Sequence, residues 1–318
     1  CETGAQGNKW RGKGMNVLVT GSSGFIGRHV VRKLASDGHS LTLFDCARDL
    51  DRPDRDPGYD VLPGVPLRWD LPWIGQDLQH PSSDVPLVDA VKQASVVLHL
   101  AGNANTKAHD DPRVQMGDVA MAAKVLTACA RFGKPVLVAS SAYALARTPR
   151  TPYGETKVLI EGIAEAFSGA GNRVAVARFF NVYGPGQEHA VTYSSTAVID
   201  LIRRFAQLRH VADIAMVDGN ALRDFIYVDD AVTMLCQAID DLLSTLQPLT
   251  GVGGYRPIYE IGSGYWTSIR DVATVIAKTM GFKGRLVFSD LQGDHSTPNL
   301  VSPRPADTNK GRRTTLEE

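Results

Sequence analysis

Short apolar runs alternate with helical patterns through the first half of the chain. Residues 16–20 form one such run, and Val30, Val31 and Leu34 then recur at helical spacing. We predict further strands at residues 41–44, 66–69, 95–100, 135–139 and 173–178, helices near 114–130 and 153–167, and mainly loop around one strand over 49–86. Because the strands are apolar throughout and alternate with helices, the pattern predicts an α/β fold with a doubly wound parallel sheet.

The pattern changes after Asn181. A loop rich in Gly and Pro precedes a predicted helix at 197–208, a strand at 225–228 and a helix from Ala231. Ser268, followed three residues later by Asp271, marks the start of another helix. We therefore expect three parts, which are an N-terminal extension (1–14), a first domain that carries the sheet (15–181), and a smaller mixed lobe from which some segments return to the sheet (182–318).

Composition narrows the class of protein without indicating a function. Of 318 residues, 43% are hydrophobic and 21% charged, which excludes a disordered chain. The 34 basic and 34 acidic residues cancel, so nothing indicates a nucleic-acid or membrane partner. No segment has the roughly 18 apolar residues of a membrane span, and residues 1–14 lack the apolar stretch of a secretory signal. Cys1, Cys46, Cys129 and Cys236 lack disulfide or metal-site spacing, so we expect no metal and a cytoplasmic location.

Three glycines follow the first predicted strand and lead into the first helix. In a dinucleotide site, Gly21 would make the tight turn, Gly24 would let the backbone approach a pyrophosphate, and Gly27 would let the helix pack on its strand. The N–H groups of the helix N-terminus favour phosphate. Asp45 ends the second strand, where an acid accepts hydrogen bonds from the adenosine ribose. This favours NAD, although Arg48 leaves NADP open. The alternative is that the glycines only shape a turn.

A serine, a tyrosine and a lysine form the candidate catalytic set. Tyr153 and Lys157 are four residues apart at the start of a helical pattern, so they share one face. Ser141 ends a predicted strand, where a parallel sheet places its ligand crevice. We expect Tyr153 to act as base, Lys157 to favour its phenolate form and Ser141 to hold the reacting oxygen by a hydrogen bond. The alternative is that Tyr153 and Lys157 are ordinary surface residues.

The ordered series of motifs resembles the extended short-chain dehydrogenase/reductase family, in its branch of NAD-dependent nucleotide-sugar epimerases and dehydratases. The resemblance runs from Met15 to about Ala277, implies a Rossmann-type sheet, and is carried by VTGSSGFIG (19–27), HLAG (99–102), ASSA (139–142), PYGETK (152–157), RFFNVYGPG (178–186), RDFIYVDDA (223–231) and EIGSG (260–264). It implies a homodimer formed through two helices and NAD-binding residues along the first domain: Gly21, Gly24, Phe25, Ile26, Gly27, Asp45, Asp70, Leu71, Leu100, Ala101, Gly102, Tyr153, Lys157 and Phe180.

The resemblance also implies a substrate side. Arg223 matches an arginine that grips the diphosphate of a sugar nucleotide, which suits a bidentate cation. The alternative is a salt bridge from Arg223 to Asp224 or Asp229. The expected substrate-binding residues are Ser141, Asn181, Arg223 and Arg304.

Departures from the family pattern narrow the expected reaction. Dehydratases of the family have an Asp-Glu pair where Ala142 and Tyr143 follow Ser141, so the acid for water loss is missing and the pattern favours 4-epimerases. Asp118 stands where the family usually has asparagine, which either alters cofactor binding or is a tolerated isostere. The segment 141–153 is shorter than usual, and the motifs RPAD and ADTNK overlap near residue 306.

The leading hypothesis is therefore an NAD-dependent 4-epimerase of a UDP-hexose that works through a transient 4-keto sugar. The alternative is an NAD(P)-dependent reductase or dehydrogenase of a keto-sugar nucleotide or a small carbinol, which the short 141–153 segment motivates. A non-catalytic dinucleotide-binding protein is the third hypothesis, and the intact set of Ser141, Tyr153 and Lys157 argues against it.

Overall fold

A seven-stranded parallel sheet forms the centre of the molecule in the computed structural model, which describes residues 14–46, 71–145, 151–187, 197–207, 213–217, 219–244 and 257–289. The strand order is β11-β6-β5-β4-β1-β2-β3, and every neighbouring pair is parallel. The strands are β1 (Asn16–Thr20), β2 (Ser40–Asp45), β3 (Trp73–Gly75), β4 (Val96–His99), β5 (Val136–Ser141), β6 (Val174–Phe179) and β11 (Ile258–Ile261). This order, which reverses between β1 and β4, confirms the predicted doubly wound Rossmann-type sheet.

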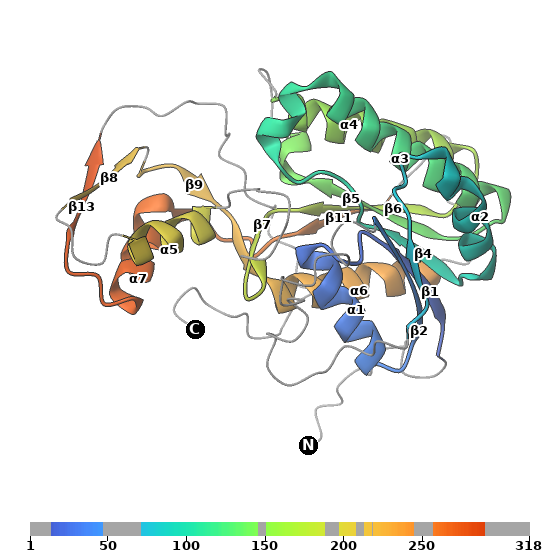
Figure 1. The fold of residues 1–318 in the computed structure, drawn as a ribbon, viewed down its shortest axis with the longest axis horizontal. Helices are drawn as coiled ribbons and strands as arrows, with labels where there is room; N and C mark the ends of the chain where they lie inside the picture. Colours follow the sequence, from blue (N-terminus) through green and yellow to red (C-terminus); the bar gives the residue numbers. More distant parts are fainter. Residues whose placement is uncertain are drawn as a thin grey trace.

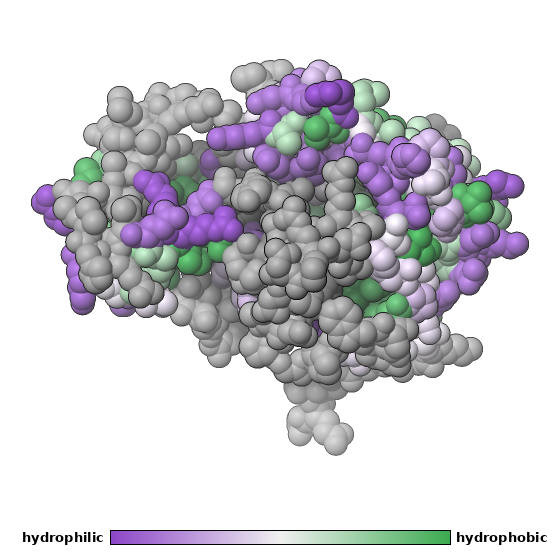
Figure 2. Space-filling model, viewed as in Figure 1, coloured by the Kyte–Doolittle hydropathy of each residue, from purple (hydrophilic) through white to green (hydrophobic). Residues whose placement is uncertain are grey.

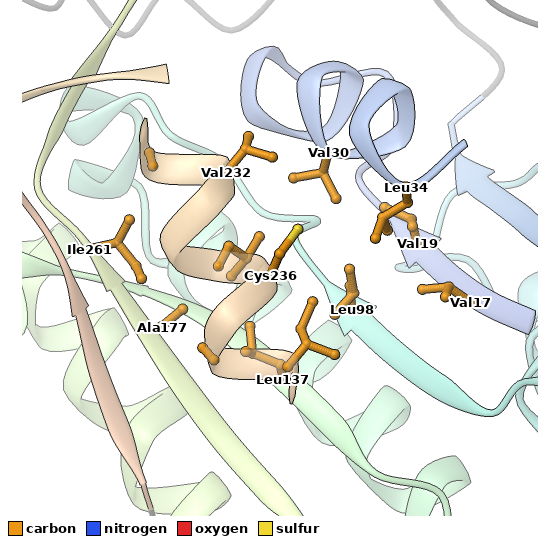
Figure 3. Close-up of a cluster of buried hydrophobic side chains, with 14 of the residues drawn as sticks. Val17, Val19, Val30, Leu34, Leu98, Leu137, Ala177, Val232, Cys236 and Ile261 are labelled. Atoms are coloured by element: carbon orange, nitrogen blue, oxygen red, sulfur yellow. The ribbon is translucent and has the colours of Figure 1, made fainter. Parts of the chain in front are cut away.

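Helices cover both faces of the sheet (Figure 1). One face carries α1 (Phe25–Ser36) and α6 (Val228–Ser244), and the other carries α2 (Asp84–Gln93), α3 (Pro112–Arg131) and α4 (Pro152–Gly169). Figure 3 shows Val30 of α1 facing Val232 of α6, and Leu34 of α1 next to Val19 of β1. Leu18, the next position along β1, belongs to the core cluster on the opposite face. The strands are apolar throughout because both of their faces are buried.

The stretch 49–86, predicted as mainly loop around one strand, contains more regular structure than expected. Strand β3 lies at Trp73–Gly75, whereas the predicted strand at 66–69 lies outside the described residues. The prediction missed α2, which begins at Asp84 after a short 3₁₀ helix, η3 (Pro81–Ser83). Asp84 and Pro86 are typical of loops, but both are also well tolerated in the first turn of a helix. Helix α6 begins at Val228, three residues before the predicted start.

A smaller mixed lobe lies at one end of the sheet (Figure 1). It contains α5 (Ala197–Gln207), α7 (Ile269–Thr279), and the parallel pair β8 (Asp213–Val217) and β13 (Arg285–Ser289). Two short pairs connect it to the main body, namely β7 (Asn181–Tyr183) with β10 (Phe225–Tyr227) and β9 (Leu222–Arg223) with β12 (Thr267–Ser268). As predicted, Ser268 caps α7, because its side chain accepts a hydrogen bond from the Asp271 N–H at 3.0 Å. The division of the chain at residue 181 stays a prediction.

The surface of the described part is mixed in character. On the face in Figure 2, hydrophilic residues surround small, separate apolar patches. Within the described ranges, no helix combines the length and the apolar character that crossing a membrane requires.

Candidate active site

The glycine loop between β1 and α1 is held by close backbone packing. Gly21 has a positive φ of 70°, and its N–H donates to the Phe44 carbonyl at 2.9 Å. A Cβ at Gly21 would lie 2.5 Å from the backbone nitrogen of Ala101, and a Cβ at Gly27 would overlap the Gly21 carbonyl oxygen. These contacts leave no room for a side chain at either position. The loop therefore joins β1, β2, β4 and α1 at the carboxyl edge of the sheet.

The same loop fits the pyrophosphate of a dinucleotide. Gly24 is the N-cap of α1 and has no side chain that could accept a hydrogen bond from the first turn, and this turn contains no acidic residue. Among the described residues, a Cβ at Gly24 would meet only the Gly21 carbonyl oxygen, at 3.3 Å. The N–H groups of this first turn, which includes Phe25 and Ile26, are therefore available to an anion. Gly21, Gly24 and Gly27 are the residues that could hold the cofactor phosphates.

Asp45 lies beside this loop at the end of β2. Its carboxylate accepts hydrogen bonds from the N–H groups of Ser23, at 2.7 Å, and Cys46, at 2.8 Å. Burial raises the pKa of Asp45, and the two backbone donors oppose that shift. This position suits an acceptor for the ribose hydroxyls. Leu71 packs against the core beside α1, whereas Asp70 and Arg48 lie outside the described residues.

The segment that follows β4 runs along the glycine loop. The N–H groups of Leu100 and Ala101 donate to the backbone and side-chain oxygens of Thr20. The same Thr20 hydroxyl lies 2.8 Å from Nδ1 of His99, and burial lowers the pKa of His99 to about 4. His99 is therefore neutral near pH 7. These bonds hold Leu100 and Ala101 beside the glycine loop, and Gly102 follows them directly.

Strand β5 and helix α4 bring the predicted catalytic set together. The Ser141 hydroxyl oxygen at the end of β5 accepts from the Tyr143 N–H at 3.3 Å, and the Tyr143 ring meets the Tyr153 ring edge to face at 5.4 Å. Tyr153 lies in the first turn of α4, which Thr151 caps. Lys157 follows one turn later, with Nζ 5.2 Å from the centroid of the Tyr153 ring. The structure thus brings Ser141, Tyr153 and Lys157 together where β5 ends and α4 begins.

A buried polar cluster that the sequence did not reveal lies next to this set. Both carboxylate oxygens of Asp118 accept from the Asn103 N–H, at 3.0 and 3.1 Å. Oδ2 of Asp118 also lies 3.3 Å from Nε2 of His109, on the 3₁₀ helix η4 (Thr106–Asp110), and 3.5 Å from Nζ of Lys157. Asp118 stood out in the sequence, but nothing there indicated His109 as its partner.

A second buried network supports the strand ends behind Ser141. Glu161 of α4 accepts from the Ser140 hydroxyl at 2.7 Å and from two guanidinium nitrogens of Arg178 at 2.8 and 2.7 Å. Arg178 also lies 3.7 Å from Glu260 of β11. Burial raises the pKa of Glu260, while Arg178 opposes the shift. This network ties α4 to β5, β6 and β11.

The substrate side is organised around Asp224. Its buried carboxylate accepts from the N–H and hydroxyl of Ser263 and from the N–H of Gly264, at 2.6 to 2.8 Å. Its carbonyl oxygen accepts from both the backbone and side-chain nitrogens of Asn181, each at 3.0 Å. Arg223, on β9, is buried and donates to the Leu222 carbonyl at 2.8 Å. Asn181 is thus hydrogen-bonded to Asp224, the residue that follows Arg223. Arg304 lies outside the described residues.

Comparison with known proteins identifies the family. A model of the NAD-dependent epimerase/dehydratase family matches residues 17–249. The chain belongs to this family. UDP-glucose 4-epimerase 3 of Oryza sativa subsp. japonica is 26% identical over 301 residues, which cover 86% of this chain and 78% of the rice protein.

Two solved structures of similar proteins match nearly the whole chain. The NAD-dependent NDP-hexosamine 5,6-dehydratase TunA, involved in tunicamycin biosynthesis, has a TM-score of 0.72 at 24% identity and covers 96% of this chain and 94% of its own. MoeE5 in complex with UDP-glucuronic acid and NAD has a TM-score of 0.65 at 28% identity. The match covers 91% of this chain and 90% of the MoeE5 chain. The epimerase/dehydratase fold is therefore present over most of the chain.

Membership of the epimerase/dehydratase family confirms the resemblance to extended short-chain dehydrogenases/reductases. The protein is an NAD-dependent enzyme of the nucleotide-sugar epimerase/dehydratase type, and NAD is its cofactor. The roles of the individual cofactor, substrate and catalytic residues stay predictions. For Phe180, the structure adds that it is buried and that its N–H donates to the Ile261 carbonyl at 3.0 Å, beside Asn181.

Proposed function

We propose that this enzyme is a 4-epimerase of a UDP-hexose. The observation that supports this most directly is the position of Ser141, Tyr153 and Lys157 at one edge of the sheet, with Ala142 and Tyr143 after Ser141. Removal of water from a sugar needs an additional acid and base. Ala142 and Tyr143 supply no carboxyl group for this purpose, whereas epimerisation needs only one group that takes and returns a proton.

Each residue has a defined task in this reaction. Tyr153 takes the proton of the sugar C4 hydroxyl, while Ser141 donates a hydrogen bond to the same oxygen. Lys157 favours the phenolate form of Tyr153 through its positive charge. Bound NAD supplies a reversible hydride acceptor. After the 4-keto sugar has turned over, Tyr153 returns the proton to the oxygen and the hydride would return to C4 on its other face, so protons and electrons balance over the cycle.

The diphosphate of the substrate is assigned to Arg223. Asp224, the next residue, is fixed by Ser263 and Gly264, so the backbone that carries Arg223 is rigid. Asn181 shares this anchor and lies beside the end of β6. The proposal therefore places the diphosphate on the lobe side of the crevice and the sugar near Tyr153.

A homodimer through α3 and α4 is part of the proposal. Met116 of α3 and Leu159 of α4 are 61% and 52% exposed, so each of these helices has a large apolar side chain that a second subunit would cover. Light scattering of the purified protein measures its mass in solution. The cytoplasmic location expected from the cysteine pattern stays a prediction.

A proton NMR time course with UDP-glucose or UDP-galactose, without added cofactor, tests the reaction. We expect the anomeric signal of the other epimer to appear in the native protein. Tyr153→Phe should abolish this signal while retaining bound NAD, and Tyr265→Phe, which removes a phenol hydroxyl at an exposed position, is the matched control. Consumption of free NAD(H) in proportion to product would instead indicate a reductase. The absence of any epimer over a panel of nucleotide sugars, with NAD bound, would contradict 4-epimerisation.

A further inference from the structure

A buried histidine and a buried aspartate lie beside the ring of Tyr153. Asp118 is 2% exposed and His109 is fully buried. The His109 ring meets the Tyr153 ring edge to face, with the centroids 4.9 Å apart. Lys157 Nζ lies 3.5 Å from Asp118 Oδ2, which in turn lies 3.3 Å from His109 Nε2. Three ionisable side chains therefore share one buried space next to the phenol.

The hydrogen bonds of His109 require a proton on each ring nitrogen. Nδ1 lies 2.9 Å from the carbonyl oxygen of Asn105, which can only accept. On the other side, burial by itself would raise the pKa of Asp118, but the hydrogen bond from His109 and the charge of Lys157 outweigh it and hold that pKa below its usual value. Asp118 is therefore a carboxylate, which also only accepts. A neutral imidazole has only one N–H and can donate to only one of these two acceptors. His109 donates to both only when it is protonated, as the imidazolium.

The charge beside Tyr153 depends on this proton. With His109 protonated, His109 and Lys157 carry positive charge and Asp118 carries negative charge, so the net charge is positive. Without that proton, Asp118 would cancel Lys157. The titratable group facing the cluster from β4 is His99, and burial lowers its pKa to about 4, so it stays neutral near pH 7. A net positive charge favours a phenolate, and His109 decides whether that charge is present.

We propose that His109 and Asp118 form a positioning pair for Tyr153 and Lys157, in which protonated His109 offsets Asp118 so that Lys157 keeps its effect on the phenol. The kinetic part of this inference rests on the proposed epimerase reaction. The protonation of His109 does not depend on it.

The kinetic test compares the full-length protein with His109→Leu, Asp118→Asn and the double variant, from about pH 6 to about pH 9. His109→Leu should lower kcat about tenfold at neutral pH, because Asp118 then opposes Lys157. The double variant removes both charges and should recover kcat to within about threefold of the native protein. If the pair only fills space, the two losses multiply in the double variant, and that result would overturn the proposal.

A spectroscopic test is independent of the substrate. In the NMR spectrum of protein with ¹⁵N-labelled histidine, the His109 signal, identified by its loss in His109→Leu, should show two protonated ring nitrogens at neutral pH. A single neutral tautomer would refute the proposal. Two protonated nitrogens in a protein that epimerises no nucleotide sugar would support the pair and contradict the proposed function. His109→Gln, which keeps a donor without the charge, replaces His109→Leu if the latter does not fold.

Discussion

Replacing His99 by asparagine removes a buried imidazole that the folded protein holds neutral. Burial lowers the pKa of His99 from 6.5 to about 4. His99 binds a proton at about pH 6.5 in the unfolded chain but only near pH 4 in the folded protein. The free energy of unfolding is therefore highest above pH 6.5 and falls as the pH drops toward 4. Between pH 7.5 and pH 5, this difference amounts to a loss of about 2 kcal/mol.

Urea unfolding at those two pH values measures this loss directly. The free energy of unfolding of the native protein should fall by about 2 kcal/mol more than that of His99→Asn. Asparagine retains an acceptor for the Thr20 hydroxyl, which lies 2.8 Å from Nδ1 of His99. A cavity created by the substitution lowers the free energy of unfolding equally at both pH values, so it does not affect the pH-dependent difference. Burial also lowers the pKa of His39, but His39 is present in both proteins and its contribution cancels in the comparison. Equal pH dependence in the two proteins would refute the burial argument.

Two further substitutions test the glycine loop and the network behind Ser141. Gly27→Ala should cost about 1–3 kcal/mol and release NAD, because its Cβ overlaps the Gly21 carbonyl oxygen, whereas Gly169→Ala at the open end of α4 should change neither. The melting temperature measures the loss of stability, and the amount of NAD recovered from the denatured purified protein measures how much was bound. A Gly27→Ala protein that binds as much NAD as the native protein would contradict the loop geometry. Arg178→Met leaves buried Glu161 without its cation and should cost about 3–5 kcal/mol in urea unfolding, with partial recovery on adding Glu161→Gln. A loss below about 1 kcal/mol would show that the pair contributes little.

Local patterns in the sequence were sufficient for the glycine loop and for five strands of the sheet, whereas β3 lies at other residues than predicted and β11 was not predicted. Strands buried on both faces are apolar at every position, and helices between them repeat at helical spacing, so these elements can be recognised without knowing their partners. The spacing of Gly21, Gly24 and Gly27 is likewise local, and the structure shows why Gly21 and Gly27 accept no side chain. Helix α2 was not predicted because Asp and Pro, which occupy positions 84 and 86, are found in loops as well as in the first turn of a helix.

Tertiary packing alone decided which polar side chains meet. His109 and Asp118 lie on different helices, and only the packing of η4 against α3 and α4 brings them to Tyr153 and Lys157. Asp224 and Ser263 are 39 residues apart, yet one carboxylate joins the segment of Arg223 to the loop after β11. Hydrogen bonds and charge pairs carry no periodicity, so a sequence shows which groups exist but not which distances separate them. The protonation of a buried side chain depends on those distances, and for that reason only the structure could assign it.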